Sequence, residues 1–135
     1  MQSILKALGL ALGLAIAAPA LAGDAAHSIE GDVYGEGTFT GASRHVTTGH
    51  GAIIQQDGKW YVSLAEDFFF DGAPDPKVAL GNDGYDPDTL LEPLRENTGA
   101  QLYEIPASID VTAYNEIWIW CEQFAVPLGV AALTN

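Results

Sequence analysis

The dipeptide Asp57-Gly58 separates two short segments that are rich in β-branched and aromatic residues. An Asp-Gly pair in this setting is the strongest short-range sign of a β-hairpin, because a two-residue turn requires positive φ angles. The sequence therefore predicts two antiparallel strands, at residues 52–56 and 60–64, joined by a tight turn. This turn sets three cross-strand pairs: Gln56 with Lys59, Ile53 with Val62, and Ile54 with Tyr61.

Similar segments recur along the rest of the chain at a spacing of about ten residues, with Gly, Pro, Asn and Asp between them. The chain has 135 residues, which suffice for one domain. The pattern predicts an all-β fold, a compact antiparallel β-sandwich or barrel-like single domain. The further segments expected as strands are residues 37–41, 77–80, 101–105, 116–124 and 126–133.

The most apolar of these strands carries the sequence's one cysteine. Ile117, Ile119 and Cys121 alternate with Trp118 and Trp120, so the two sets point to opposite faces of the sheet. Both faces are apolar, which predicts a central strand that is covered on each side.

The N-terminal region has the pattern of a secretory signal. Residues 1–22 combine a basic start, an uncharged apolar run and small residues at Ala20 and Ala22, and we expect cleavage after Ala22. The protein is therefore expected to be secreted or periplasmic, with no stable membrane insertion after cleavage. Residues 23–36 are polar and read as a flexible leader, which leaves residues 37–135 for the β domain.

The charge balance excludes two classes of partner. The chain has 18 Asp and Glu against 5 Lys and Arg, a formal net charge of −13. Nucleic acids and anionic membrane surfaces are bound by clustered Lys and Arg, so this chain is predicted to bind neither. Its surface would suit a cationic partner or a salty milieu.

Cys121, as the sequence's one cysteine, rules out an intrachain disulfide framework and a four-thiolate iron–sulfur cluster. Two interpretations of it remain. It is either a redox-active thiol or a ligand to haem or copper, or it is a small buried hydrophobic residue within a strand. No Lys or Arg lies near it in sequence to lower the pKa of the thiol.

The histidines and the acidic turns offer only weak metal sites. His45, His50 and Cys121 are the residue types of a His₂Cys copper centre, but no His or Met follows the cysteine, which argues against copper. Residues 82–88 are rich in carboxylates without EF-hand spacing, so calcium is disfavoured as well. Covalent haem attachment needs C-x-x-C-H, which is absent, whereas noncovalent haem on Cys121 or His45 stays open.

Four motifs in order resemble those of the DM13 domain family, an extracellular and periplasmic module. Residues 45–49 resemble its opening H-x-x-x-G, and residues 67–80 resemble its D-F…G-P-D…v-x-L corner. Residues 99–106 resemble its G-x-Q-x-Y-x-[IL]-P strand. Residues 119–133 resemble the most specific element, I-W-C-x-x-F-x-V-x-F-G-x-A-x-L. Leu128 and Ala73 depart from the usual Phe and Gly, and both are packing changes.

The resemblance implies an all-β domain with a redox or electron-transfer role centred on Cys121, used as a bare thiol or as a haem ligand. The chain carries this module alone, so its redox or protein partner would act in trans. Hydrolase motifs such as G-x-S-x-G, H-E-x-x-H and the P-loop are absent, which favours a function other than that of a stand-alone enzyme. The alternative is a non-catalytic binding or interaction module in which Cys121 is structural.

Overall fold

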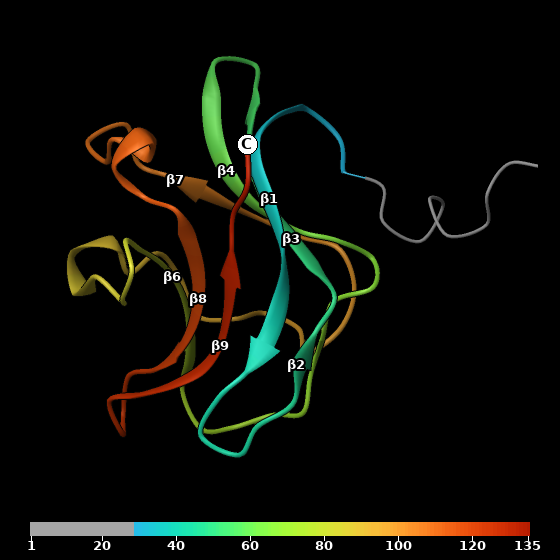
Figure 1. The fold of residues 1–135 in the computed structure, drawn as a ribbon, viewed down its shortest axis with the longest axis vertical. Helices are drawn as coiled ribbons and strands as arrows, with labels where there is room; N and C mark the ends of the chain where they lie inside the picture. Colours follow the sequence, from blue (N-terminus) through green and yellow to red (C-terminus); the bar gives the residue numbers. More distant parts are fainter. Residues whose placement is uncertain (1–28) are drawn as a thin grey trace, which may run out of the picture.

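The computed structural model describes residues 29–135 (Figure 1). The expected signal peptide, residues 1–22, and the start of the expected leader lie outside the described residues. The first strand, β1, runs over Asp32–Gly41 and so begins five residues before the expected start at Gly37. Residues 32–36 are therefore strand rather than leader. Among the described residues, no helix is long and apolar enough to cross a membrane.

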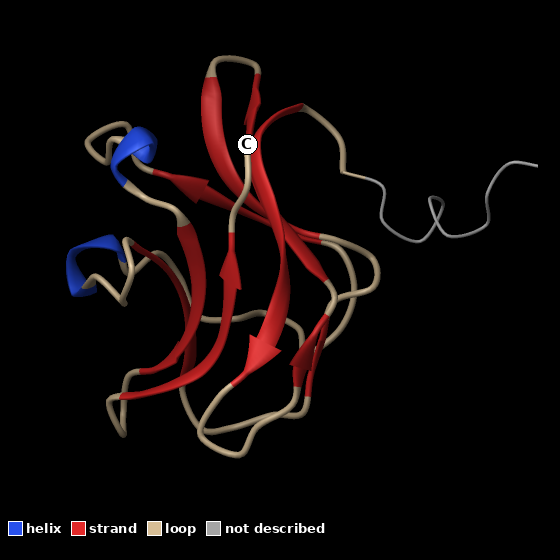
Figure 2. Ribbon diagram, viewed as in Figure 1, coloured by secondary structure: helices blue, strands red, loops and turns tan. Residues whose placement is uncertain are grey.

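Seven strands form one antiparallel sheet in the order β6-β8-β9-β1-β3-β4-β7 (Figure 2). β1 joins its two halves, because its first part pairs with β3 and its end, from Phe39, pairs with β9. The other six strands are β3 (His50–Gln56), β4 (Lys59–Leu64), β6 (Pro76–Gly81), β7 (Gln101–Ile105), β8 (Glu116–Cys121) and β9 (Val126–Ala132). A separate ribbon pairs β2 (Thr47–Thr48) with β5 (Phe69–Phe70), and two 3₁₀ turns are η1 (Pro87–Thr89) and η2 (Val111–Ala113).

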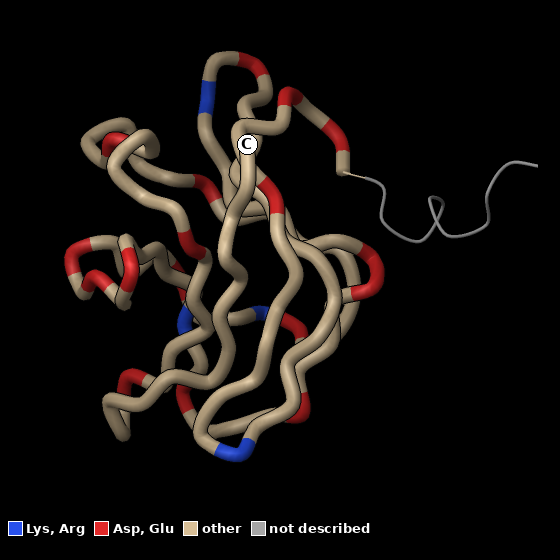
Figure 3. The backbone as a smooth tube through the Cα atoms, in the orientation of Figure 1, with Lys and Arg blue, Asp and Glu red and all other residues tan. Residues whose placement is uncertain are grey.

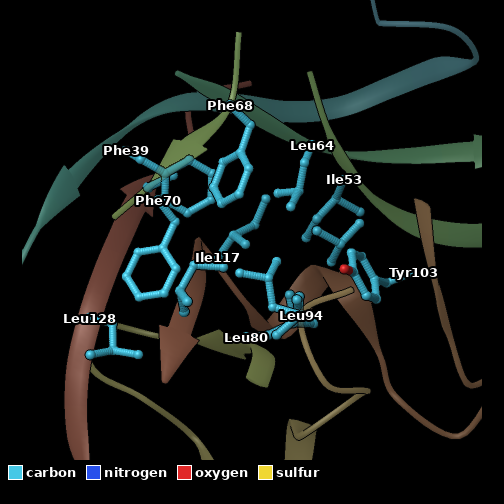
Figure 4. Close-up of a cluster of buried hydrophobic side chains, with 14 of the residues drawn as sticks. Phe39, Ile53, Leu64, Phe68, Phe70, Leu80, Leu94, Tyr103, Ile117 and Leu128 are labelled. Atoms are coloured by element: carbon cyan, nitrogen blue, oxygen red, sulfur yellow. The ribbon is translucent and has the colours of Figure 1, made fainter. Parts of the chain in front are cut away.

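The two halves of this sheet enclose the hydrophobic core (Figure 4). Ile53 and Tyr103 from one half join Ile117 and Leu80 from the other half in one buried cluster. A strand that passes from one half of a β structure to the other turns a corner, and it lets the two apolar faces pack together. The structure is thus a single, nearly closed, barrel-like all-β domain, which confirms the predicted fold class.

The hairpin around Asp57-Gly58 forms as predicted. Asp57 has φ of 52° and Gly58 has φ of 77°, the positive values that a two-residue hairpin turn requires. The three expected cross-strand pairs are all present: Gln56 with Lys59, Ile53 with Val62, and Ile54 with Tyr61.

β8 is central in hydrogen bonding, between β6 and β9, and its two faces differ in burial. Ile117, Ile119 and Cys121 are at most 1% exposed, whereas Trp118 and Trp120 are half-buried. The prediction that both faces are covered is confirmed for the inner face and only in part for the outer face, where Tyr85 of the loop after β6 stacks on Trp120 and the tryptophans stay half-buried. The strand also ends at Cys121 instead of continuing to residue 124.

Candidate functional site

Cys121 occupies the last position of β8, where it pairs with Pro76 of β6 and Val126 of β9. Its side chain is free, belongs to the core and is 1% exposed. The thiol donates a hydrogen bond to the backbone carbonyl of Pro74, with Sγ 3.1 Å from the oxygen. Because a carbonyl can only accept, the thiol hydrogen is the donor in this contact.

Residues 74–76 form the corner that covers the thiol, and the ammonium group of Lys77 ties this corner to the end of β8. Asp75, between the two prolines of the corner, has a φ of 54°. Lys77 Nζ lies 2.6 Å from Asp75 Oδ1 and 3.2 Å from Glu122 Oε1. The hydrogen bond to Asp75 raises the pKa of Lys77, and Glu122 contributes in the same direction. Lys77 therefore links the corner to the residue that follows Cys121.

His45, the second predicted cofactor residue, lies at the β2–β5 ribbon. Its Nδ1 donates to Asp71 Oδ1 at 2.9 Å, and Asp71 Oδ2 accepts the backbone N–H of Val46 at 3.0 Å. The backbone hydrogen bond from Val46 and then the His45 side chain lower the pKa of Asp71. In the neutral ring this arrangement leaves the lone pair on Nε2, the atom that a metal or haem iron would take.

A second His–Asp pair closes the other end of the same ribbon. His50 Nδ1 lies 2.5 Å from Asp67 Oδ2, and the His50 backbone N–H donates to Asp67 Oδ1 at 2.9 Å. The ribbon pairs Thr47 with Phe70 and Thr48 with Phe69, so the two His–Asp pairs bracket it. These histidines of the H-x-x-x-G region therefore fasten the ribbon to the aspartates of the D-F corner.

The structure places His45 and Cys121 in different hydrogen-bonded settings. In the part of the chain that the structure describes, no group of three or more His, Cys, Asp or Glu side chains is arranged to hold a metal ion. A cavity of about 620 Å³ opens between β4, β7 and residues 95–101, and neither Cys121 nor His45 lines it.

A haem iron on Cys121 would need an open face above the sulfur. The thiol is instead 1% exposed, packed in the core and engaged with the Pro74 carbonyl. The residues in this arrangement therefore do not fit a haem at Cys121.

Two carboxylates of residues 82–88 fasten their loop to the segment that precedes β8. Asp83 Oδ1 accepts from Asn115 Nδ2 at 3.1 Å, and Asp86 Oδ2 accepts from the Tyr114 hydroxyl at 2.8 Å. The hydrogen bond to Asp86 raises the pKa of Tyr114. Asp86 also makes the local contact typical of a turn residue, because its Oδ1 accepts from the Asp88 backbone N–H at 2.9 Å.

Tyr85 and Lys77 are residues near the β8 strand that sequence reasoning did not select. Tyr85 stacks on Trp120, with ring centroids 3.8 Å apart and an interplanar angle of 10°. Lys77 lies opposite Trp120 across the β6–β8 ladder. Both contacts join residues distant in sequence, and no local pattern in one sequence indicates them.

Comparison with known proteins adds one finding. A family model described as electron transfer DM13 matches residues 38–133, which covers every strand from the second half of β1 to β9. No curated protein and no solved structure gives a significant match to this chain.

Proposed function

The chain belongs to the electron transfer DM13 family, and we propose that it is an exported accessory domain of electron transfer whose redox group is the thiol of Cys121. The observation that carries the proposal is the place of this thiol. It is free, it lies within the matched region, and a corner held by side-chain contacts closes over it.

The chemistry available to a bare thiol is a two-electron exchange with a disulfide. The sulfur of Cys121 attacks one sulfur of a disulfide R–S–S–R, the S–S bond breaks, and R–SH leaves with the proton. Cys121 is oxidised to a mixed disulfide as the leaving sulfur is reduced. Because the thiolate is the attacking species, the thiol must first leave the Pro74 carbonyl, which requires the covering corner to open.

The proposed compartment agrees with this chemistry. A secreted or periplasmic location, as the sequence pattern of residues 1–22 predicts, is oxidising and favours exchange between thiols and disulfides. The oxidant is then a disulfide-bearing partner acting in trans. The bare thiol is preferred to haem ligation because the closed packing around Sγ does not fit a haem.

The test is the reaction of the native protein with glutathione disulfide. We expect Cys121 to form a mixed disulfide with glutathione under native conditions, detected by intact mass, and to return to the thiol with a reductant. The Cys121→Ser variant is the control and should gain no mass. A thiol that reacts only after denaturation would contradict the proposal.

An absorption spectrum and metal analysis of protein isolated from its native compartment complete the test. A visible haem band or stoichiometric copper that persists in wild type but is lost in Cys121→Ser would replace the bare thiol with a metal-bound one. A spectrum without these features, together with glutathione exchange, supports the thiol.

The near-complete burial of Cys121 favours a second candidate, an interaction module in which the cysteine is structural. This candidate predicts that Cys121→Ala changes the free energy of unfolding by about 1–2 kcal/mol and leaves partner binding intact. Loss of partner binding in a Cys121→Ala variant that stays folded would count against it.

A further inference from the structure

The outer face of β6 and β8 carries a layer of aromatic rings, which we call the aromatic face: Tyr85, Trp118 and Trp120. All three are half-buried, and each comes from the sheet or from the loop that follows β6. Trp118 has room against the sheet because position 81 is glycine: a Cβ there would lie 2.3 Å from Trp118 Nε1. Ala79, between the core-facing residues of β6, is 0% exposed, so side chains lie over it.

Carboxylates surround the aromatic face. Glu116 lies on the same side of β8 as the two tryptophans, and its Oε1 accepts from Trp118 Nε1 at 3.2 Å. Glu122 Oε1 lies 3.2 Å from the ammonium of Lys77, the residue opposite Trp120 on β6, and Asp86 directly follows Tyr85 in the loop. Burial first, and then the charges of Glu122 and Asp86, raise the pKa of Tyr85. Figure 3 shows acidic positions gathered along the loop that follows β6.

Positive charge is scarce here. Residues 75–88 and 116–135 contain one Lys and no Arg. That residue, Lys77, is already ion-paired with Asp75 and Glu122. The aromatic face therefore combines partly exposed ring surface with a negative rim whose one cation is already engaged.

Such a surface is complementary to side chains that carry a positive charge on an apolar stem. Lys and Arg place their methylene groups along ring surface and their charge toward carboxylates, and Arg also stacks on Trp and Tyr rings. A second copy of this chain is a poor occupant, because a chain of net charge −13 meets its own like charge at the interface.

We propose that the aromatic face is a docking surface for a partner protein that presents a Lys- and Arg-rich surface. Trp118 and Trp120 make the apolar contact, and Glu116, Glu122 and Asp86 attract and orient the cations. The docking goes beyond the redox role of Cys121, which points from the opposite face of β8, and needs no thiol chemistry.

Tryptophan fluorescence gives a direct binding assay. The chain has three Trp, so a Trp60→Phe background leaves only the two of the aromatic face as reporters. The probe is a synthetic peptide of alternating Arg and Gly residues, with an alternating Glu and Gly peptide as its negative control. We expect the Arg peptide alone to change the fluorescence, and added salt to weaken its binding.

Two variants locate the binding site. Tyr85→Ala should weaken peptide binding about threefold to tenfold, as expected for a partly exposed cation–π contact. The double variant Glu122→Gln with Asp86→Asn removes two rim charges and leaves the rings in place, so it remains informative if Tyr85→Ala perturbs the fold. We expect it to weaken binding by a similar factor.

The matched control is Asp32→Asn with Asp57→Asn. It removes the same charge at the start of β1 and at the β3–β4 turn, remote from the aromatic face along the sheet, and Asn-Gly suits that turn as well as Asp-Gly does. Control binding should stay within error of the background protein. Equal weakening in the control would show a general attraction of an acidic chain for a cation and would overturn the proposal. So would binding that neither salt nor the rim variant changes, as for a neutral ligand such as a sugar.

Discussion

The two faces of β8 differ although both are apolar in sequence. The inner residues Ile117, Ile119 and Cys121 are buried in the core, whereas Trp118 and Trp120 on the outer face are only half-buried. Burial on one face specifies the fold, and partial exposure of aromatic side chains on the other face offers a surface for binding. An apolar strand face is thus not by itself a sign of a core.

The largest effect should come from the inner face. Ile119→Ala removes a fully buried side chain and leaves a cavity, so we expect a loss of about 2–5 kcal/mol in the free energy of unfolding. The matched outer change, Val130→Ala, truncates a half-buried residue that pairs with Trp118 and should cost about 1 kcal/mol. Urea denaturation of both variants measures the difference, and equal losses would contradict the contrast between the faces.

The sequence predicts the parts of this fold that interactions between residues close in sequence specify. The Asp57-Gly58 turn sets its own hairpin register, and the alternating segment at Gln101–Ile105 forms β7 with the expected bounds. The start of β1 escaped prediction because glycines read as loop. Within the missed part, a Cβ at Gly35 would lie 2.9 Å from Asn135 Oδ1, so this glycine permits close approach of the C-terminal residues to the strand.

The candidate site was predictable only as far as its residue types. Cys121 was identified from the motif that contains it, and the family assignment was confirmed by the match over residues 38–133. Its closed setting depends on the Pro74 carbonyl and the Lys77–Glu122 pair, which join segments more than forty residues apart in sequence. The stacking of Tyr85 on Trp120 likewise joins residues that are distant in sequence, so no local pattern indicates it.

A substitution at the corner over Cys121 should have an effect of intermediate size, because the corner couples the ion pairs on the outer face to the thiol on the inner face. Lys77→Met removes the ammonium that holds Asp75 and Glu122 and keeps an apolar stem of similar length. If these ion pairs stabilise the closed corner by about 1 kcal/mol, the corner of the variant opens about fivefold more often than that of the wild type. We therefore expect native Cys121 to react about fivefold faster with iodoacetamide.

The control for that measurement is Lys59→Met. It breaks the exposed pair between Lys59 and Glu104, 3.6 Å apart, on the other half of the sheet. The alkylation rate should then equal that of the wild type. Global stability must be measured for both variants, because unfolding also exposes the thiol. An unchanged rate in Lys77→Met at equal stability would show that the corner opens independently of Lys77.

The smallest effect should appear at high pH, on the outer face. Burial raises the pKa of Tyr85 above its usual value of 10.0, with the charges of Glu122 and Asp86 adding to the shift. A folded-state pKa raised above the unfolded value gives stability that is complete below pH 10.0 and is lost as pH rises through the folded-state pKa. Tyr85→Phe keeps the ring on Trp120 and removes the titrating hydroxyl, so its melting temperature should fall less steeply than that of the wild type above pH 10.0. Tyr103, in the core, also has a pKa raised by burial, so both proteins should retain the alkaline loss that it causes. If the melting temperatures of the two proteins fall with the same slope above pH 10.0, Tyr85 is as solvated in the folded state as in the unfolded chain. The outer face would then be more open than the stacking of Tyr85 on Trp120 indicates.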